Sequence, residues 1–175
     1  MSFSHDAASF YRRKLTSSHK TPHENQDYCG WSTHWAKVAT MDYLGRFPRD
    51  FKVELKEIRT EHRSGQTPAK LMQAEAERIL AVIEPGEYVV VLDERGRDLT
   101  TMSFTTDIAR WRNERLDVVF IIGGPDGLAP EVKSVANETI RLSSMTLPHT
   151  LARVFLAEQI YRAWSILAKH PYHRA

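Results

Sequence analysis

Residues 118–127 read VVFIIGGPDG, and this stretch decides the fold. Five apolar residues without a break are typical of a strand buried on both faces, as in a parallel sheet that helices cover. The glycines that follow let the backbone approach a ligand closely, at the sheet edge where α/β proteins bind ligands. The stretch is not a G-x-G-x-x-G, so a dinucleotide site is not indicated. A tight turn that binds nothing is the alternative interpretation.

The flanking sequence alternates between helical and strand patterns. Apolar residues spaced three or four apart predict helices, and continuous or alternating apolar residues predict strands. The predicted elements are a weak helix over 35–45, a strand over 51–55, a helix from 68 to 84, a strand over 88–92, a helix around 104–111, the strand over 118–122, a short helix from 130, a strand over 139–145 and a helix over 150–169. Strands alternating with helices predict an α/β fold with a mainly parallel sheet.

The remaining segments are predicted to be irregular. Residues 1–34 are rich in Ser, His, Thr and Asn and show no sustained period, so we expect a poorly ordered segment before one domain over 35–175. A polar loop is expected over 60–66, and a charged loop over 93–98. Asp93, which follows the strand over 88–92, is either a turn residue or a functional one.

The charge of the chain is unevenly distributed. The 175 residues carry a net charge of only +2, which by itself argues against a nucleic-acid partner. The last 35 residues, however, contain five of the 24 Lys and Arg and one of the 22 Asp and Glu, so they carry +4 and the preceding 140 carry −2. Aromatic and basic residues mix in the terminal HPYHR, residues 170–174, which suits docking against RNA. A solvated helix face with a frayed tail is the alternative.

Cysteine and histidine usage argues against metal and disulfide chemistry. Cys29 is the one cysteine, which excludes an intramolecular disulfide and a four-cysteine zinc site. His170 and His173 have a plausible ligand spacing, but Pro171 interrupts it, so no metal is expected. The N-terminal sequence lacks the apolar stretch of a secretory signal, and no apolar run is long enough to span a membrane, so a cytoplasmic protein is expected.

A second candidate binding segment is LSSMTLPH, residues 142–149. Small hydroxyl residues beside apolar ones at a strand end can offer backbone amides and carbonyls to a flat ring. Pro148 fixes the turn into the last helix. A strand, a turn and a capped helix without any ligand is the alternative.

Four motifs together resemble one known family. GGPDG (123–127), LSSMTLPH (142–149), EQIYRAW (158–164) and HPYHR (170–174) occur in the order and spacing of the ribosomal RNA large subunit methyltransferase H family, of the SPOUT superfamily. The resemblance extends from about Tyr43, through RFPRD at 46–50, to the end of the chain. Family members begin with an apolar strand and a short glycine-containing loop. Residues 1–34 show no such strand, so either it is absent or an unusual segment replaces it.

The resemblance implies a SPOUT-type α/β fold with a C-terminal trefoil knot and a homodimer. It implies an enzyme that uses S-adenosylmethionine to methylate N3 of a pseudouridine in the 23S rRNA of the ribosome, with neither a membrane nor DNA as a partner. S-adenosylmethionine has no phosphate, which agrees with the missing phosphate loop. The cofactor-binding residues carried over by motif are Leu92, Gly123, Leu142, Ser143, Ser144, Met145, Thr146 and Leu147.

Three residues near the C-terminus are candidates for the chemistry. The imide N3 of a uracil-type base must lose a proton, and His173 is the first candidate for the base because histidine titrates near neutral pH. Tyr172 could stack on or orient the target nucleotide. Arg162 could hold a phosphate or the carboxylate of the cofactor. Two other functions stay open: a SPOUT methyltransferase acting on another RNA such as tRNA, and a non-catalytic RNA-binding module of the same fold.

Overall fold

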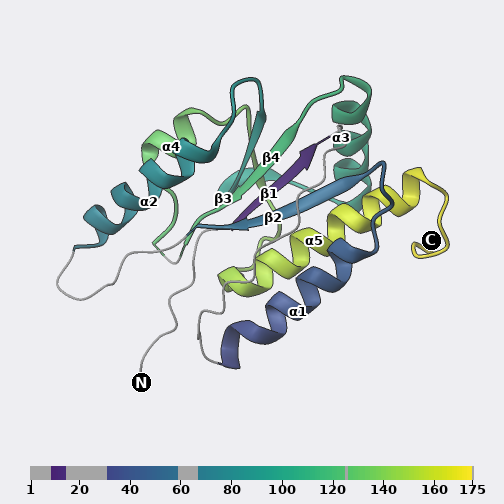
Figure 1. Ribbon diagram of the computed structural model, residues 1–175, viewed down its shortest axis with the longest axis horizontal. Helices are drawn as coiled ribbons and strands as arrows, with labels where there is room; N and C mark the ends of the chain where they lie inside the picture. Colours follow the sequence, from purple (N-terminus) through teal and green to yellow (C-terminus); the bar gives the residue numbers. More distant parts are fainter. Residues whose placement is uncertain (1–8, 15–30, 59–66, 125, 175) are drawn as a thin grey trace.

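A computed structural model describes residues 9–14, 31–58, 67–124 and 126–174 of the chain. Its strands form one sheet in the order β2-β1-β4-β3-β5, with helices on both faces (Figure 1). The elements are, in chain order, β1 (Ser9–Lys14), α1 (Trp31–Gly45), β2 (Lys52–Glu57), α2 (Pro68–Val82), β3 (Tyr88–Asp98), α3 (Thr101–Asn113), β4 (Val118–Ile122), α4 (Pro130–Ser134), β5 (Glu138–Arg141) and α5 (His149–Leu167).

The strand directions agree with the predicted α/β class. β3 runs parallel to both of its neighbours, β4 and β5. β1 runs antiparallel to both of its neighbours, β2 and β4, so β1 alone among these strands points the opposite way. The three parallel strands therefore end at one edge of the sheet.

The two faces of the sheet carry separate apolar cores. Side chains alternate between faces along a strand. Val90 and Phe120 accordingly pack with α3 and α5, whereas Val89, Val91 and Val119 pack on the face that α2 and α4 cover. The first part of β3 and all of β4 are buried on both faces, which explains why their apolar residues follow one another without a break.

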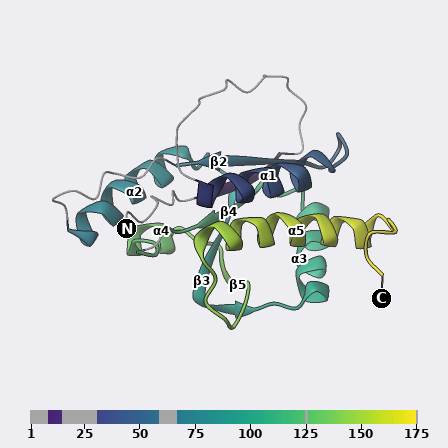
Figure 2. The ribbon, with the colours of Figure 1, turned by 90° about the horizontal axis from the view of Figure 1, so that it is seen from below.

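The helices form two groups around the sheet. α2 and α4 lie on one face, and α1, α3 and α5 lie on the other, with α1 and α5 side by side in both views (Figures 1 and 2). α5 packs against both α1 and α3. None of the helices in the described residues is long and apolar enough to cross a membrane.

The prediction of an irregular segment over residues 1–34 is wrong where the structure describes that segment. Residues 9–14 form β1, which lies between β2 and β4, and α1 begins at Trp31 rather than at residue 35. Residues 1–8 and 15–30, which include Cys29, lie outside the described residues, and so does the polar loop predicted over 60–66.

The predicted loop over residues 93–98 is also wrong, because β3 continues through it to Asp98. The pairing with β5 shifts register between Leu92 and Arg97, so the strand contains a bulge. At this bulge Gly96 passes so close to β5 that a Cβ would lie 2.4 Å from the carbonyl carbon of Ile140.

The strand predicted over 139–145 is longer than the strand in the structure. β5 ends at Arg141, and an irregular loop follows it.

Candidate functional site

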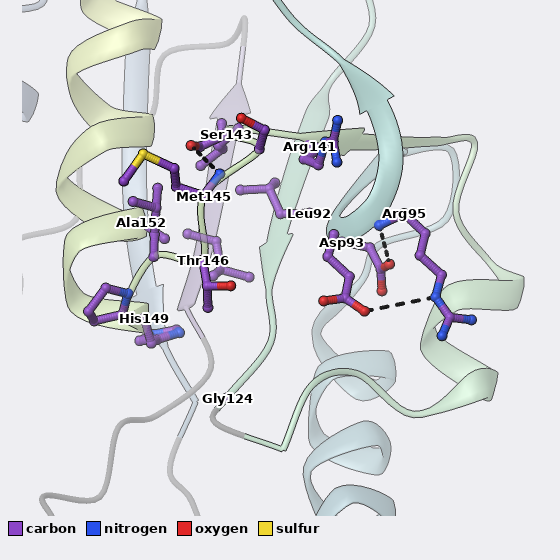
Figure 3. Close-up of a pocket in the computed structure, with 16 residues that line it drawn as sticks. Leu92, Asp93, Arg95, Gly124, Arg141, Ser143, Met145, Thr146, His149 and Ala152 are labelled. Carbon is purple, nitrogen blue, oxygen red and sulfur yellow. Dashed lines mark hydrogen bonds and ion pairs between the residues drawn. The ribbon is translucent and has the colours of Figure 1, made fainter.

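A pocket of about 720 Å³ lies at the edge where the three parallel strands end. Three chain segments surround it, and Figure 3 shows their side chains around the space. The first is the bulged part of β3, the second follows β4, and the third is the loop between β5 and α5. The lining residues are Leu92, Asp93, Glu94, Arg95, Ile122, Gly124, Arg141, Leu142, Ser143, Ser144, Met145, Thr146, Leu147, Pro148, His149 and Ala152.

The structure brings the residues predicted for the cofactor to this one pocket. Leu92 and all six residues over 142–147 line it. Gly123 does not line it in the described structure, but its neighbours Ile122 and Gly124 do. A Cβ on Gly123 would lie 2.8 Å from Cγ of Leu128 and 2.9 Å from the carbonyl carbon of Gly127, so the chain can pass here only as glycine.

The loop over residues 142–148 is held by local contacts. The backbone N–H of Met145 donates to Oγ of Ser143 at 2.9 Å. The Met145 side chain is 76% exposed although its loop lines the pocket. Pro148 ends the loop, and its carbonyl accepts the first backbone hydrogen bond of α5, from Ala152 at 2.9 Å. The loop thus presents several backbone groups to the pocket from an irregular conformation.

Two polar contacts connect the walls of the pocket. Nδ1 of His149 lies 2.7 Å from the carbonyl oxygen of Gly123, which joins the loop before α5 to the segment after β4. Nζ of Lys133, on α4, lies 2.5 Å from Oδ2 of Asp93, which joins α4 to the bulged part of β3. The sequence pointed to neither contact, because each partner is far away along the chain.

Asp93 acts as a turn residue, which is one of the two alternatives that the sequence left open for it, and it also lines the pocket. Its Oδ1 accepts from the backbone N–H of Arg95 at 2.9 Å, as a turn residue does. The hydrogen bond from Lys133, followed by that from the Arg95 backbone, holds the pKa of Asp93 below its usual value. The Asp93 carboxylate therefore stays ionised in the pocket wall, as an ion pair with Lys133.

The three residues predicted for the chemistry form a second cluster, at the other end of α5. Nε and Nη2 of Arg162 donate to Oε1 of Glu158 at 2.7 and 2.5 Å. The Tyr172 hydroxyl donates to the same oxygen at 3.0 Å, and its ring lies under the Arg162 guanidinium, 4.9 Å away. Nη1 of Arg162 lies 3.4 Å from Nδ1 of His173. Glu158, which the sequence singled out only as part of a motif, is the centre of this cluster.

The protonation states in this cluster follow from its contacts. Burial, together with hydrogen bonds to Tyr43 and Glu158, raises the pKa of Tyr172 well above its usual value, so the phenol keeps its proton at neutral pH. A guanidinium only donates, so Nδ1 of His173 is the acceptor in the contact with Arg162. In this cluster, Nδ1 of His173 therefore carries no hydrogen and accepts from Arg162, and the protonated Tyr172 hydroxyl donates to Glu158.

One chain does not bring this cluster to the pocket. Arg162 is 13 residues beyond His149 on α5, which corresponds to roughly 20 Å along a straight helix. The two ends of α5 lie far apart in both ribbon views (Figures 1 and 2).

A metal site would need a group of at least three His, Cys, Asp or Glu side chains. No such group is found among the residues that the structure describes.

The neighbouring helices α1 and α5 leave large apolar side chains exposed. Trp35, Val38 and Met41 on α1 are 48%, 54% and 54% exposed, and Leu151 and Phe155 on α5 are 38% and 37% exposed. The spacing of three and four residues places each set on one face of its helix. We refer to these five side chains as the α1–α5 apolar surface. Exposed apolar surfaces of this kind are common at protein interfaces.

Comparisons with known proteins agree with the geometry of the pocket. A family model described as "Predicted SPOUT methyltransferase" matches residues 30–173. The chain is 56% identical to the ribosomal RNA large subunit methyltransferase H of Bordetella petrii over 142 residues, which cover 81% of this chain and 91% of that protein. It is 53% identical to the protein of the same name from Delftia acidovorans over 140 residues, 80% of this chain and 90% of the other.

Proposed function

The chain belongs to the SPOUT methyltransferase family, and from this premise we propose that it is an rRNA methyltransferase that uses S-adenosylmethionine to methylate N3 of a pseudouridine in 23S rRNA. The relatives are named as ribosomal RNA large subunit methyltransferases. The observation that carries the proposal is the pocket at the strand ends, which seven of the eight residues expected for the cofactor line.

The residues of the pocket fit S-adenosylmethionine. Leu92, Leu142, Leu147 and Ala152 offer apolar surface to a flat adenine ring, and the irregular loop over 142–148 offers backbone donors and acceptors to its edge. Charged groups of both signs in the wall, including Asp93, suit the amino and carboxylate groups of the methionine part. When bound, S-adenosylmethionine supplies an activated methyl group, so the chain has mainly to position the two reactants.

The cluster around Glu158 supplies the remaining chemistry. Alkylation of an imide nitrogen releases one proton, and we assign its removal to Nδ1 of His173, the ring nitrogen without hydrogen, which takes the proton once the nucleotide has replaced Nη1 of Arg162 as its partner. Tyr172 remains protonated, which favours a role in orienting the nucleotide over a role as the base. Arg162 holds His173 and Tyr172 in place, and its positive charge is available to a phosphate of the RNA.

A homodimer completes this site. The pocket and the His173 cluster are roughly 20 Å apart along α5 of one chain, so we assign the tail at each pocket to the second copy. The α1–α5 apolar surface supports this assignment, because its five large apolar side chains are exposed in one chain and pairing two copies would bury them. The net positive charge of the last 35 residues would then lie beside each pocket, where RNA must bind.

The proposal includes two further properties that the resemblance implies. The trefoil knot requires the C-terminal segment to pass through a loop, and the contact of His149 with Gly123, which brings the start of α5 against the loop after β4, supports it. An experimental structure in which α5 passes outside that loop would contradict the trefoil knot. A cytoplasmic location follows from the proposed ribosomal substrate.

The deciding experiment maps the methylated nucleotide. Ribosomes from a strain that lacks this methylation are incubated with the purified protein and radiolabelled S-adenosylmethionine, and the modified position is located by mass spectrometry of 23S rRNA fragments. We expect one methyl group on one pseudouridine, and loss of the reaction in His173→Ala. Label on tRNA alone would favour the alternative substrate. Absence of any calorimetric heat with S-adenosylmethionine would favour the non-catalytic RNA-binding module.

A mixed dimer tests the shared site directly. A variant with a weakened pocket, Gly123→Ala, is co-expressed with His173→Ala, and the assay keeps S-adenosylmethionine far below the raised Kd of the first variant, so that each variant by itself is nearly inactive. Half of the randomly formed dimers are mixed, and each mixed dimer keeps one intact site, so roughly a quarter of the wild-type activity should return. If both halves of the site came from one chain, no mixture would be active.

A further inference from the structure

His149 connects the two loops that frame the pocket. It is the first residue of α5 and it lines the pocket. Its Nδ1 lies 2.7 Å from the carbonyl oxygen of Gly123, and a carbonyl oxygen only accepts, so Nδ1 is the donor. This one hydrogen bond joins residues that are 26 positions apart, and Figure 3 shows His149 at the start of α5 among the residues that line the pocket.

The His149 ring lies against the pocket wall. The N-cap residue of α5 is Pro148, whose side chain makes no capping hydrogen bond. The half-buried ring of His149 contacts the segment after β4. The ring is therefore committed to the pocket wall.

The loop that His149 holds is anchored to the core at its start, where Leu142 packs against it. Residues 142–148 form neither strand nor helix, and the hydrogen bond from Met145 to Ser143 is local to the loop. Gly123, by contrast, is tightly confined, since Leu128 and Gly127 lie within 3 Å of the place where its Cβ would be. The hydrogen bond therefore ties a loosely supported wall to a rigid one.

We propose that His149 is a positioning residue, which fixes the loop over 142–148 against Gly123 so that the pocket is formed before S-adenosylmethionine binds. The proposal rests on the proposed function for the identity of the ligand. A pocket that is formed in advance loses less conformational entropy on binding. What the pocket needs from this residue is a hydrogen-bond donor at the Nδ1 position.

Three substitutions separate the donor from the ring. Asparagine places its amide nitrogen where Nδ1 lies, whereas glutamine places it one bond further, and alanine has no donor. We expect His149→Asn to bind S-adenosylmethionine within about threefold of the wild type, because the donor is kept. We expect His149→Gln and His149→Ala to bind it roughly 5- to 50-fold more weakly, because the Gly123 carbonyl loses its partner.

Two measurements on the full chain test the proposal. Calorimetry gives the Kd for S-adenosylmethionine, and steady-state methylation should show a raised KM for it in the Gln and Ala variants, with kcat within about threefold. Hydrogen–deuterium exchange without ligand should be faster over residues 142–148 in those two variants, and unchanged in His149→Asn.

The outcomes separate this inference from the proposed function. If His149→Asn binds as weakly as His149→Ala, or if His149→Ala binds and exchanges like the wild type, His149 is not a positioning residue. If the wild-type protein does not bind S-adenosylmethionine at all, the proposed function fails. The exchange measurement then still decides whether His149 holds the two loops together.

Discussion

Replacing Gly123 by alanine adds one methyl group at a confined point next to the pocket, between the lining residues Ile122 and Gly124. The new Cβ would lie 2.8 Å from Cγ of Leu128, 2.9 Å from the carbonyl carbon of Gly127 and 3.2 Å from its oxygen. Carbon atoms in contact are ordinarily about 3.5–4.0 Å apart, so the neighbours must move by roughly 0.7 Å or more. Leu128 can rotate, but Gly127 is backbone, with φ at +83° and a bridge to Gly124.

This overlap has a cost in stability and a cost in binding. An added methyl group in a well-packed place costs about 1–3 kcal/mol. For a domain of this size the expected decrease in Tm is roughly 3–9 °C. Moving Gly127 also moves the Gly123 carbonyl that His149 contacts, and a shift near 1 Å in a binding site can cost a large factor, so we expect the Kd for S-adenosylmethionine to rise about tenfold or more.

Differential scanning fluorimetry measures the change in Tm, and calorimetry measures the change in the Kd for S-adenosylmethionine. The control variant is Gly45→Ala. Gly45 is the last residue of α1, and a Cβ there would meet no described atom within 4 Å. The control should melt within about 3 °C of the wild type, since the loss of chain entropy in the unfolded state is small. A Gly123→Ala protein that melts within a degree of the wild type and binds equally well would refute the steric reasoning.

Three further variants test the charge, the dimer and the tail. The contact with Lys133 lowers the pKa of Asp93, so the ion pair stabilises the fold above the usual pKa of aspartate. This stabilisation is lost as the pH falls through the pKa of Asp93 in the folded protein. In thermal melts, Lys133→Met should therefore have a Tm about 1–3 °C lower than the wild type at pH 7, and the difference should shrink toward pH 3. Val38→Glu should yield monomers in sedimentation and abolish methylation without lowering the stability of the single chain, because that side chain is 54% exposed. Tyr172→Phe removes the hydroxyl that donates to Glu158, and its methylation rate should fall about 10- to 100-fold, as for a lost hydrogen bond to a charged group. The pH profile should be unchanged from roughly pH 6 to 9, because the raised pKa of the phenol keeps it from titrating there.

The parallel part of the fold could be predicted because its signal is local. The uninterrupted apolar residues of β4 and of the first part of β3 indicate burial on both faces, and the structure confirms both strands. β1 was missed because SFYRRK has two aromatic residues followed by three basic ones, without the alternation of a half-buried strand. Its place is decided by pairing with β2 and β4, which are distant in the sequence.

The second half of β3 was missed for a related reason. DERGRD, residues 93–98, contains no apolar residue, so no pattern in the sequence indicates a strand. Pairing of Arg97 and Asp98 with β5 holds it, and the side chain of Asp98 forms an ion pair with Arg141. Gly96 allows this approach because it has no Cβ to collide with Ile140.

The candidate site was predictable as a set of residues but not as a set of contacts. The segments around Leu92, Gly123 and 142–147 stand out because strands ending in glycine or small residues converge at one edge of a parallel sheet. The contacts of His149 with Gly123 and of Lys133 with Asp93 depend on where separate loops meet in space. The spacing of residues along the sequence does not indicate where these loops meet.

The length of the tail argues for a site shared between two chains. From Leu167, the last residue of α5, to His173 is six residues, which span roughly 20 Å when fully extended. Ala152, in the pocket, is fifteen residues before Leu167, roughly 22 Å back along the helix. The tail of the same chain could reach its own pocket only by extending completely.

Full extension would also break the contacts that hold the tail. The Tyr172 ring packs on Tyr161 at 4.8 Å, its hydroxyl contacts Glu158, and the backbone N–H of His170 donates to Ser165 at 2.8 Å. α5 is also held in place by its packing against α1 and α3, and near its start the buried Arg153 pairs with Glu57 of β2. A second copy can bring a tail to the pocket in the conformation it already has. The mixed dimer is therefore the experiment that decides between a site shared by two chains and a site within one.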